Sequence, residues 1–453
     1  MISTSKKPVS DDLNNIQSYK SLLLSSLRSS TFLNPTLNLH SPSSTLYVSP
    51  SLTSLATCVV IGVSCSTSSV GSYAGFTGLG MLRASTFGQS DSGNIDADQV
   101  ERAIKLGCAG REECLVIVDG GCTDEDLLRI AIGMERVRDE LGLRIDWILP
   151  RRTLEGPAAA AANLLCKIIG AAAERGLPLS ILAPLGKAVS NSLGVITHFG
   201  PPISDVANPT EDNSSLATTS SISTLVSSLL SSLLTSQSRN PIPFLQNVDG
   251  AEEKETALVI THFGGISSVE VGSIVDHVVR QLAEHDIHPS RLYSIPSSAS
   301  ESRGGFSIAL LNISHAHHLF RAALLQASQS QSSSALPTGH GEDDDEYAFE
   351  EWLESLHVPD ILTLLDDPTG TQCWSSNGTS PYSTSHSNPS ANSGSASSAI
   401  RNVGWTWPRN PKRAKGEKEN DEEFSAKVIF GASMASSRRN TGVGVHSSEI
   451  EAD

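Results

Sequence analysis

Hydrophobic residues follow a regular pattern in the second half of the chain. An apolar run at 257–260 (ALVI) is followed by the turn sequence THFGG at 261–265. Apolar residues then recur at three- and four-residue spacing across 271–282, which places them on one face of a helix. A second apolar run covers 305–313. This order of strand, glycine turn, helix and strand predicts a β-α-β unit of a mixed α/β fold.

The first half of the chain contains further apolar runs. The run at 55–63 is too continuous to have one polar face, so it predicts a central strand that is buried on both faces. Additional strands are expected at 114–118 and 143–149. The Ala-rich run at 157–173 is short for a membrane span and contains Lys167, so a packed helix is expected there.

Composition excludes several classes of function. The 453 residues carry a net charge of −17, whereas nucleic-acid-binding proteins need a basic face, so we expect no nucleic-acid partner and no membrane partner. The hydrophobic fraction of 38% is low and serine is abundant, which indicates a folded core with disordered insertions. The seven cysteines include no C-x-x-C pair, so we expect small core residues in a reducing compartment and no metal site. No signal peptide is recognisable, and a cytoplasmic location is therefore expected.

Several segments together resemble a known family. They are GFTGLGML at 75–82, the glycine turn at 264–265, SESRGGFS at 300–307 and ILTLLDDPTGTQCW at 361–374. In this order they resemble the substrate-binding K domain of dihydroxyacetone (glycerone) kinases. The resemblance implies two α/β subdomains of the K-domain type, within roughly residues 17–374. The expected division is a disordered N-terminus at 1–12, subdomains at 13–195 and 196–374 with disordered insertions at about 203–221 and 327–346, and a disordered tail at 375–453.

The resemblance also indicates a substrate loop directly after the strand at 55–63. In the family this loop is rich in glycine and contains a histidine. Here the three glycine positions fall on Ser64, Cys65 and Ser66, the fourth glycine on Ser68, and the histidine on Ser69. Serine keeps hydrogen-bonding ability but lacks the conformational freedom of glycine. Two interpretations remain open, a pocket changed to hold a different small polar ligand and a relaxed surface loop.

A catalytic aspartate is the next feature that the resemblance implies. In the family it acts as a base near the substrate hydroxyl. Asp126 takes this position if the following helix is aligned without gaps, and Asp124 takes it if the preceding strand is. The alternative is that both residues only stabilise a helix N-terminus through capping and the helix dipole.

The covalent histidine of the family has no counterpart in this chain. Family members carry it in a G-I-H-G-E-P-G motif, where it forms a carbinolamine with the substrate ketone. No histidine occurs between His198 and His262. Each of these two follows an apolar run, so both are candidates for a ligand site at a strand end, where α/β sheets bind ligands. The alternative is a pair of locally hydrogen-bonded histidines.

Complete family members also contain a helical L domain that binds ATP and magnesium. No sequence after Trp374 is long or apolar enough to form one. We therefore expect this chain to bind no cofactor by itself, with ATP and Mg²⁺ held by a missing or separate L domain. The expected partners are dihydroxyacetone or a similar small polar ligand, and a second copy of the chain or an ATP-binding subunit. Either evolutionary loss or a gene-prediction error would account for the missing segments.

Two functions follow from these expectations. The first is a component of a glycerone kinase in triose metabolism, with activity that is weak or lost. The second is a non-catalytic ligand-binding or regulatory protein that retains the fold.

Overall fold

The structure is a computed structural model. It describes residues 19–52, 54–65, 70–89, 94–150, 159–199, 222–234, 255–263, 265–296, 304–332, 358–371 and 374. These residues belong to one compact unit, residues 1–407. Within them, no helix has the length and apolar character needed to cross a membrane.

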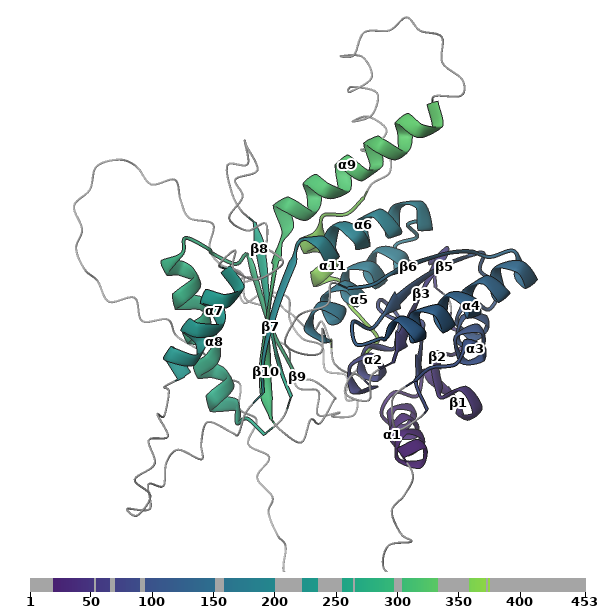
Figure 1. Ribbon diagram of the computed structural model, residues 1–453, viewed down its shortest axis with the longest axis horizontal. Coiled ribbons are helices and arrows are strands. Elements are labelled where there is room, and N and C mark those ends of the chain that lie inside the picture. Colours follow the sequence, from purple (N-terminus) through teal and green to yellow (C-terminus); the bar gives the residue numbers. More distant parts are fainter. Residues whose placement is uncertain are drawn as a thin grey trace, which may run out of the picture. The chain divides into compact units, whose positions relative to one another are not determined.

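A six-stranded sheet forms from the first part of the chain (Figure 1), with the strand order β1-β2-β4-β3-β5-β6. Its strands are β1 Leu37–His40, β2 Thr45–Val48, β3 Cys58–Ser64, β4 Ala84–Phe87, β5 Glu113–Val118 and β6 Arg144–Ile148. The strand β3 runs parallel to both β4 and β5, and β5 runs parallel to β6, whereas β1 and β2 are antiparallel additions. Every residue of β3 is buried, which confirms the predicted central strand.

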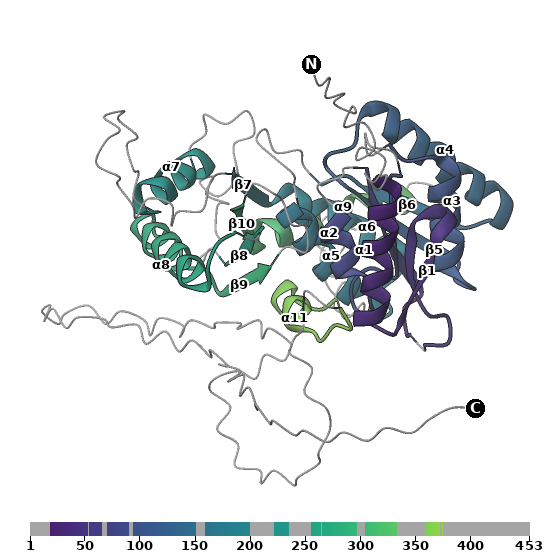
Figure 2. The same ribbon diagram turned by 90° about the horizontal axis from the view of Figure 1, so that it is seen from below.

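Helices cover both faces of this sheet (Figure 2). One face packs against α3 Ala97–Cys108 and α4 Asp124–Leu141. The other packs against α1 Tyr19–Leu33, α2 Val70–Phe76, α5 Ala159–Glu174 and α6 Leu179–Asn191. A short 3-10 helix, η2 Ser41–Ser43, joins β1 to β2. Successive side chains of β3 enter the two clusters in turn, as the alternation of a strand requires.

A four-stranded sheet forms from the later part, in the order β7-β10-β8-β9. Its strands are β7 Leu193–Phe199, β8 Thr256–His262, β9 Arg291–Pro296 and β10 Gly305–Asn312. The expected β-α-β unit is present, with α8 Ser268–Glu284 joining the parallel strands β8 and β9. The prediction that the run at 305–313 forms the second strand of this unit was wrong. That run forms β10, which lies antiparallel between β7 and β8. The sequence of β9, RLYSIP, is short and partly polar and gave no apolar run.

The remaining helices complete a mixed α/β fold, which confirms the predicted class. One face of the four-stranded sheet packs against α7 Ile222–Leu234 and α8. Its other face contacts α5, which also contacts β3, so one hydrophobic core includes residues of both sheets. The helix α9 Ile313–Ser332 packs on α6, and α11 Ile361–Asp366 packs on α5.

The predicted domain boundaries are not tested by this arrangement and stay predictions. Residues 203–221 and 375–453 lie outside the described residues. So does most of the stretch at 327–346, although its first residues, to Ser332, belong to α9.

Candidate functional site

The carboxyl ends of β3 and β5 meet at one edge of the six-stranded sheet. The two strands are parallel neighbours, with Val63 opposite Val118. Beyond this pair, Ser64 ends β3, and Asp119 begins the turn that leads to α4. The backbone N–H of Asp119 donates a 2.9 Å hydrogen bond to the carbonyl oxygen of Val63. Ligands of α/β sheets bind outside this edge, so we take it as the candidate site.

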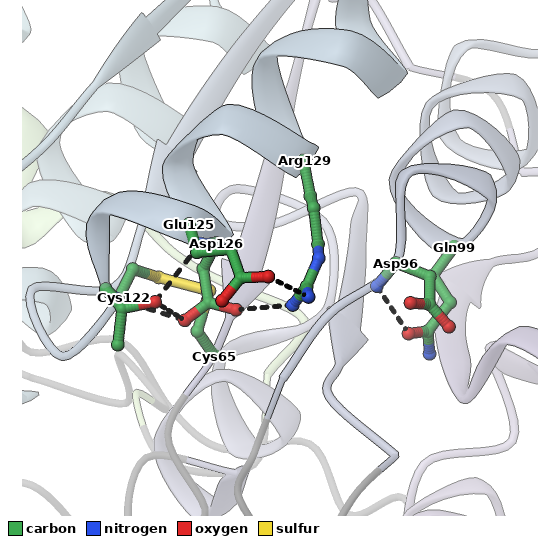
Figure 3. Close-up of polar contacts among 8 residues, drawn as sticks. Cys65, Asp96, Gln99, Cys122, Glu125, Asp126 and Arg129 are labelled. Carbon is green, nitrogen blue, oxygen red and sulfur yellow. Dashed lines mark hydrogen bonds and ion pairs between the residues drawn. A yellow bond between two sulfur atoms is a disulfide. The ribbon is translucent and has the colours of Figure 1, made fainter.

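A disulfide between Cys65 and Cys122 joins the two segments that leave this edge (Figure 3). The Cα atoms of the two residues are 5.1 Å apart, and 57 residues separate them in the sequence. The prediction of reduced core cysteines was therefore wrong for this pair. Sequence spacing does not reveal which cysteines two distant loops bring together. Four other described cysteines are free and buried, namely Cys58, Cys108, Cys114 and Cys166.

Asp126 lies next to this disulfide, in the first turn of α4, with only 2% of its surface exposed. Its Oδ2 accepts hydrogen bonds from the backbone N–H and the hydroxyl of Thr123, at 3.0 and 2.7 Å. The hydroxyl of Thr123 in turn accepts from the backbone N–H of Asp126 at 3.2 Å, which completes a capping box. The helix-capping role considered for Asp126 is thus present, whereas its role as a base stays a prediction. Asp124, the alternative candidate, is exposed at the start of the same helix.

The second carboxylate oxygen of Asp126 has a charged partner, Arg129. Oδ1 is buried and makes no hydrogen bond within the described part of the chain. Its nearest charged neighbour is the guanidinium of Arg129, 3.6 Å away, which also bonds Glu125 at 2.6 Å. Asp124, Glu125 and Asp126 place three acidic residues in the first turn of α4. Arg129 pairs with two of these three carboxylates, those of Glu125 and Asp126.

Two further polar groups belong to the same edge. Asp119 is 3% exposed, and its Oδ1 accepts a 3.0 Å hydrogen bond from the backbone N–H of Gly121. Tyr73 of α2 is 1% exposed, and its hydroxyl makes no hydrogen bond to a described residue. Burial, with smaller contributions from Cys166 and Asp119, raises the pKa of Tyr73 well above its usual range. The phenol therefore stays protonated at neutral pH and retains a hydrogen that it can donate.

The two candidate histidines lie in the other sheet. Phe306 of β10 is paired with His198 of β7 on one side and with His262 of β8 on the other, so the three side chains share one face. The rings of His198 and Phe306 are 5.8 Å apart. Burial lowers the pKa of both histidines, which favours neutral imidazoles at pH 7. The structure thus brings His198 and His262 together, but in a different sheet from Asp126.

The remaining sequence candidates are Ser64 and the serines after it. Ser64 is fully buried at the end of β3. Ser66, Ser68 and Ser69 lie outside the described residues. Among the residues that the structure does describe, no group of three or more His, Cys, Asp or Glu side chains could hold a metal ion.

Sequence comparisons relate the chain to kinases of small hydroxyketones. No family model matches it. A putative 3,4-dihydroxy-2-butanone kinase from Solanum lycopersicum is 27% identical over 271 residues, which cover 54% of this chain and 44% of that protein. A dihydroxyacetone kinase from Pichia angusta is 40% identical over 70 residues, or 15% of this chain and 12% of that protein. The chain thus matches less than half the length of either relative.

Solved structures show the same fold at low sequence identity. A structure described under the regulation of the dha operon of Lactococcus lactis has a TM-score of 0.53 and 16% identity, covering 76% of this chain and 93% of that chain. The native dihydroxyacetone kinase of C. freundii has a TM-score of 0.51 and 17% identity, covering 85% of this chain and 63% of that chain. The chain thus has the fold of a dihydroxyacetone kinase-type domain. A dihydroxyacetone kinase operon co-activator also has this fold, with a TM-score of 0.51 and 15% identity over 76% of this chain and 96% of its own.

The sequence predicts only part of this candidate site. The prediction missed Asp119 as a site residue, although an acidic residue directly after a buried strand was a usable signal. It also missed Tyr73, since α2 is a short helix and only the fold brings its phenol near Asp119.

Proposed function

We propose that the dihydroxyacetone kinase-type domain binds a small, neutral hydroxyketone, dihydroxyacetone or a close relative, at the edge where β3 and β5 end. The observation that carries this proposal is the buried Oδ1 of Asp126, which has no hydrogen bond from the described residues and only a 3.6 Å ion pair with Arg129. It lies at the edge of the sheet where α/β folds bind ligands. The names of both curated relatives, which are kinases of a hydroxyketone, support it.

The chemistry of the edge suits such a ligand. A ligand hydroxyl donates to Oδ1 of Asp126, and the protonated phenol of Tyr73 donates to a ligand oxygen. If transfer takes place, Asp126 accepts the proton of the attacking hydroxyl, as the family resemblance implies.

The phosphoryl donor would come from outside the described residues. We infer that a helical domain or a partner subunit binds ATP and Mg²⁺, which supply the phosphoryl group and neutralise its charge. The chain's own residues then bind and orient the hydroxyketone.

A non-catalytic, ligand-binding or regulatory role is the second candidate. The absence of any histidine between His198 and His262, together with serine at glycine positions of the substrate loop, favours weak or lost kinase activity. The occurrence of the same fold in an operon co-activator supports a role that requires binding alone.

Titration of the full-length chain with dihydroxyacetone tests the proposal. Isothermal calorimetry measures binding, glycerol serves as a ligand without the ketone, and mass spectrometry of the intact chain detects a covalent adduct. Saturable binding without an adduct supports the ligand-binding role, and phosphorylation after an ATP-binding helical domain is added supports the kinase. Absence of binding contradicts both.

A matched pair of variants separates ligand binding from helix capping. Glu270 caps α8 with the geometry that Asp126 has in α4, since its Oε2 accepts from the backbone N–H and hydroxyl of Ser267. Asp126→Asn is expected to weaken binding about tenfold or more, because a hydrogen bond to a charged acceptor is worth roughly 1.5–3 kcal/mol. Glu270→Gln is expected to leave binding unchanged. Equal effects of the two variants would show that Asp126 acts only as a cap.

A further inference from the structure

The Cys65–Cys122 bond differs chemically from the other described cysteines. Burial raises the pKa of the thiols of Cys58, Cys114 and Cys166 far above neutral pH. Thiols of this kind are poor nucleophiles, since the thiolate is the reactive form. The fourth free cysteine, Cys108, is buried as well, and so are Cys65 and Cys122, which are 4% and 2% exposed. The pair differs from the free thiols through its bond, because a disulfide is the group that an external thiolate attacks.

The bond lies within the candidate site. Cys65 is the residue that follows β3, and Cys122 directly precedes Thr123, the residue that caps α4 and bonds Asp126. The bond thus joins the segment leaving β3 to the segment that positions the Asp126 carboxylate (Figure 3). Any change in this bond acts directly on the distance between those two segments.

The Cys122 side has other restraints. The backbone N–H of Cys122 donates a 3.3 Å hydrogen bond to the carbonyl oxygen of Asp119, whose own N–H bonds Val63. The capping box of Thr123 and Asp126 holds the next residues. These contacts do not depend on the disulfide, so breaking it leaves Cys122 in place and releases mainly Cys65.

We propose that Cys65 and Cys122 form a reversible thiol–disulfide modification site that sets the ligand affinity of the β3–β5 edge. In the reducing direction, a thiolate of a small dithiol attacks one sulfur, the Cys65–Cys122 bond breaks and a mixed disulfide forms. The second thiol of the reductant then displaces the protein sulfur. The chain gains two electrons and two protons as two thiols, and the dithiol becomes a cyclic disulfide. A small-molecule disulfide reverses the exchange.

The size of the effect follows from the change in sulfur separation. Bonded sulfurs are about 2 Å apart, whereas non-bonded heavy atoms separate to roughly 3.5–4 Å. Reduction therefore moves Cys65 away from the Asp126 segment by about 1.5 Å, enough to disturb a ligand that contacts both. Coupling between two such states typically changes affinity by about 5–150-fold. We expect the oxidised chain to bind more tightly, because its site is already assembled.

The test uses the full-length chain in two redox states, prepared with dithiothreitol and with oxidised glutathione. After removal of reagent, alkylation under denaturing conditions and peptide mass spectrometry report which cysteines are free. Calorimetry with dihydroxyacetone reports affinity; this second readout alone rests on the proposed function. The double variant Cys65→Ser/Cys122→Ser imitates the reduced state. Cys58→Ala is the control, since it removes a buried thiol at the opposite end of β3 from the candidate site.

The expected result has two parts. Cys65 and Cys122 are alkylated only after reduction, and they are protected again after re-oxidation. Affinity falls about fivefold or more on reduction in the native chain and in Cys58→Ala, whereas the double variant binds weakly in both states. Alkylation of both cysteines in the oxidised chain would overturn the modification site. Equal affinity in both states would overturn the control of binding while leaving the proposed function intact, and binding in neither state would overturn the proposed function.

Discussion

The buried ammonium of Lys167 donates a 2.7 Å hydrogen bond to the backbone carbonyl oxygen of Asp367, 200 residues later in the chain. A second bond, of 2.8 Å, reaches the carbonyl oxygen of Leu364. Both acceptors belong to the segment around α11, so this side chain of α5 helps to hold the segment against the shared core, together with the ion pair between Arg175 and Asp367. Desolvation lowers the pKa of Lys167 to about 8, although Asp367 and Asp366 oppose the shift. At neutral pH the group remains charged and able to donate.

Replacement of Lys167 by methionine should loosen this attachment. Lys167→Met leaves two buried carbonyl oxygens without a donor but also removes a buried charge. The net loss of unfolding free energy should be about 1–3 kcal/mol. Lys187→Met is the control, because Lys187 pairs with Asp146 at the surface and its loss changes stability by less than about 0.5 kcal/mol. Denaturant titration measures both, and hydrogen exchange should rise selectively at 358–371 in the first variant. Unchanged exchange there would contradict the role of Lys167.

Gly305 is expected to tolerate no side chain. Its φ of 136° is rare for L residues, and an added Cβ would lie 2.2 Å from the carbonyl oxygen of His198. Gly305→Ala should therefore cost about 3 kcal/mol or more, through backbone strain and displacement of β7. Gly142→Ala provides the comparison, because Gly142 also has a positive φ, of 67°, but open space around it. That variant should lose only about 1 kcal/mol. If thermal unfolding showed similar losses of stability for Gly305→Ala and Gly142→Ala, backbone strain alone would account for both and the close contact with His198 would not matter.

The two capping boxes predict losses of stability of the same order, with the larger loss at Asp126. Asp126→Ala and Glu270→Ala each remove the side chain that accepts from the N-cap residue of its helix. Each should lower the unfolding free energy by about 1 kcal/mol. Because Asp126 is buried and Glu270 is only partly covered, Asp126→Ala should have the larger effect. Equilibrium denaturation of both variants provides the baseline against which any loss of ligand affinity is judged.

Features carried by local sequence were predictable, and features that depend on distant partners were not. The continuous apolar run of β3 marks it as buried on both faces, because no polar alternation interrupts it. The short strand β9 escaped detection, since half of its residues are polar or terminate strands. In the candidate site, the capping role of Asp126 was predictable from its place in the acidic first turn of a helix. The Cys65–Cys122 bond and the phenol of Tyr73 depend on loops and helices that only the folded chain brings together.

The histidines at the end of the four-stranded sheet predict a pH dependence of stability. Burial lowers the pKa of His198 and His262 in the folded state, while the unfolded chain titrates near 6.5. Between these values the unfolded state binds more protons, so unfolding free energy falls as pH decreases from about 7.5 and levels off below the folded pKa. The slope is at most about 1.4 kcal/mol per pH unit for each histidine. The variant His198→Asn/His262→Asn should show a flatter profile in denaturant titrations from pH 5 to pH 8. Imidazole proton shifts measured by NMR give the folded pKa directly, and a value above 6.5 for either ring would contradict this account.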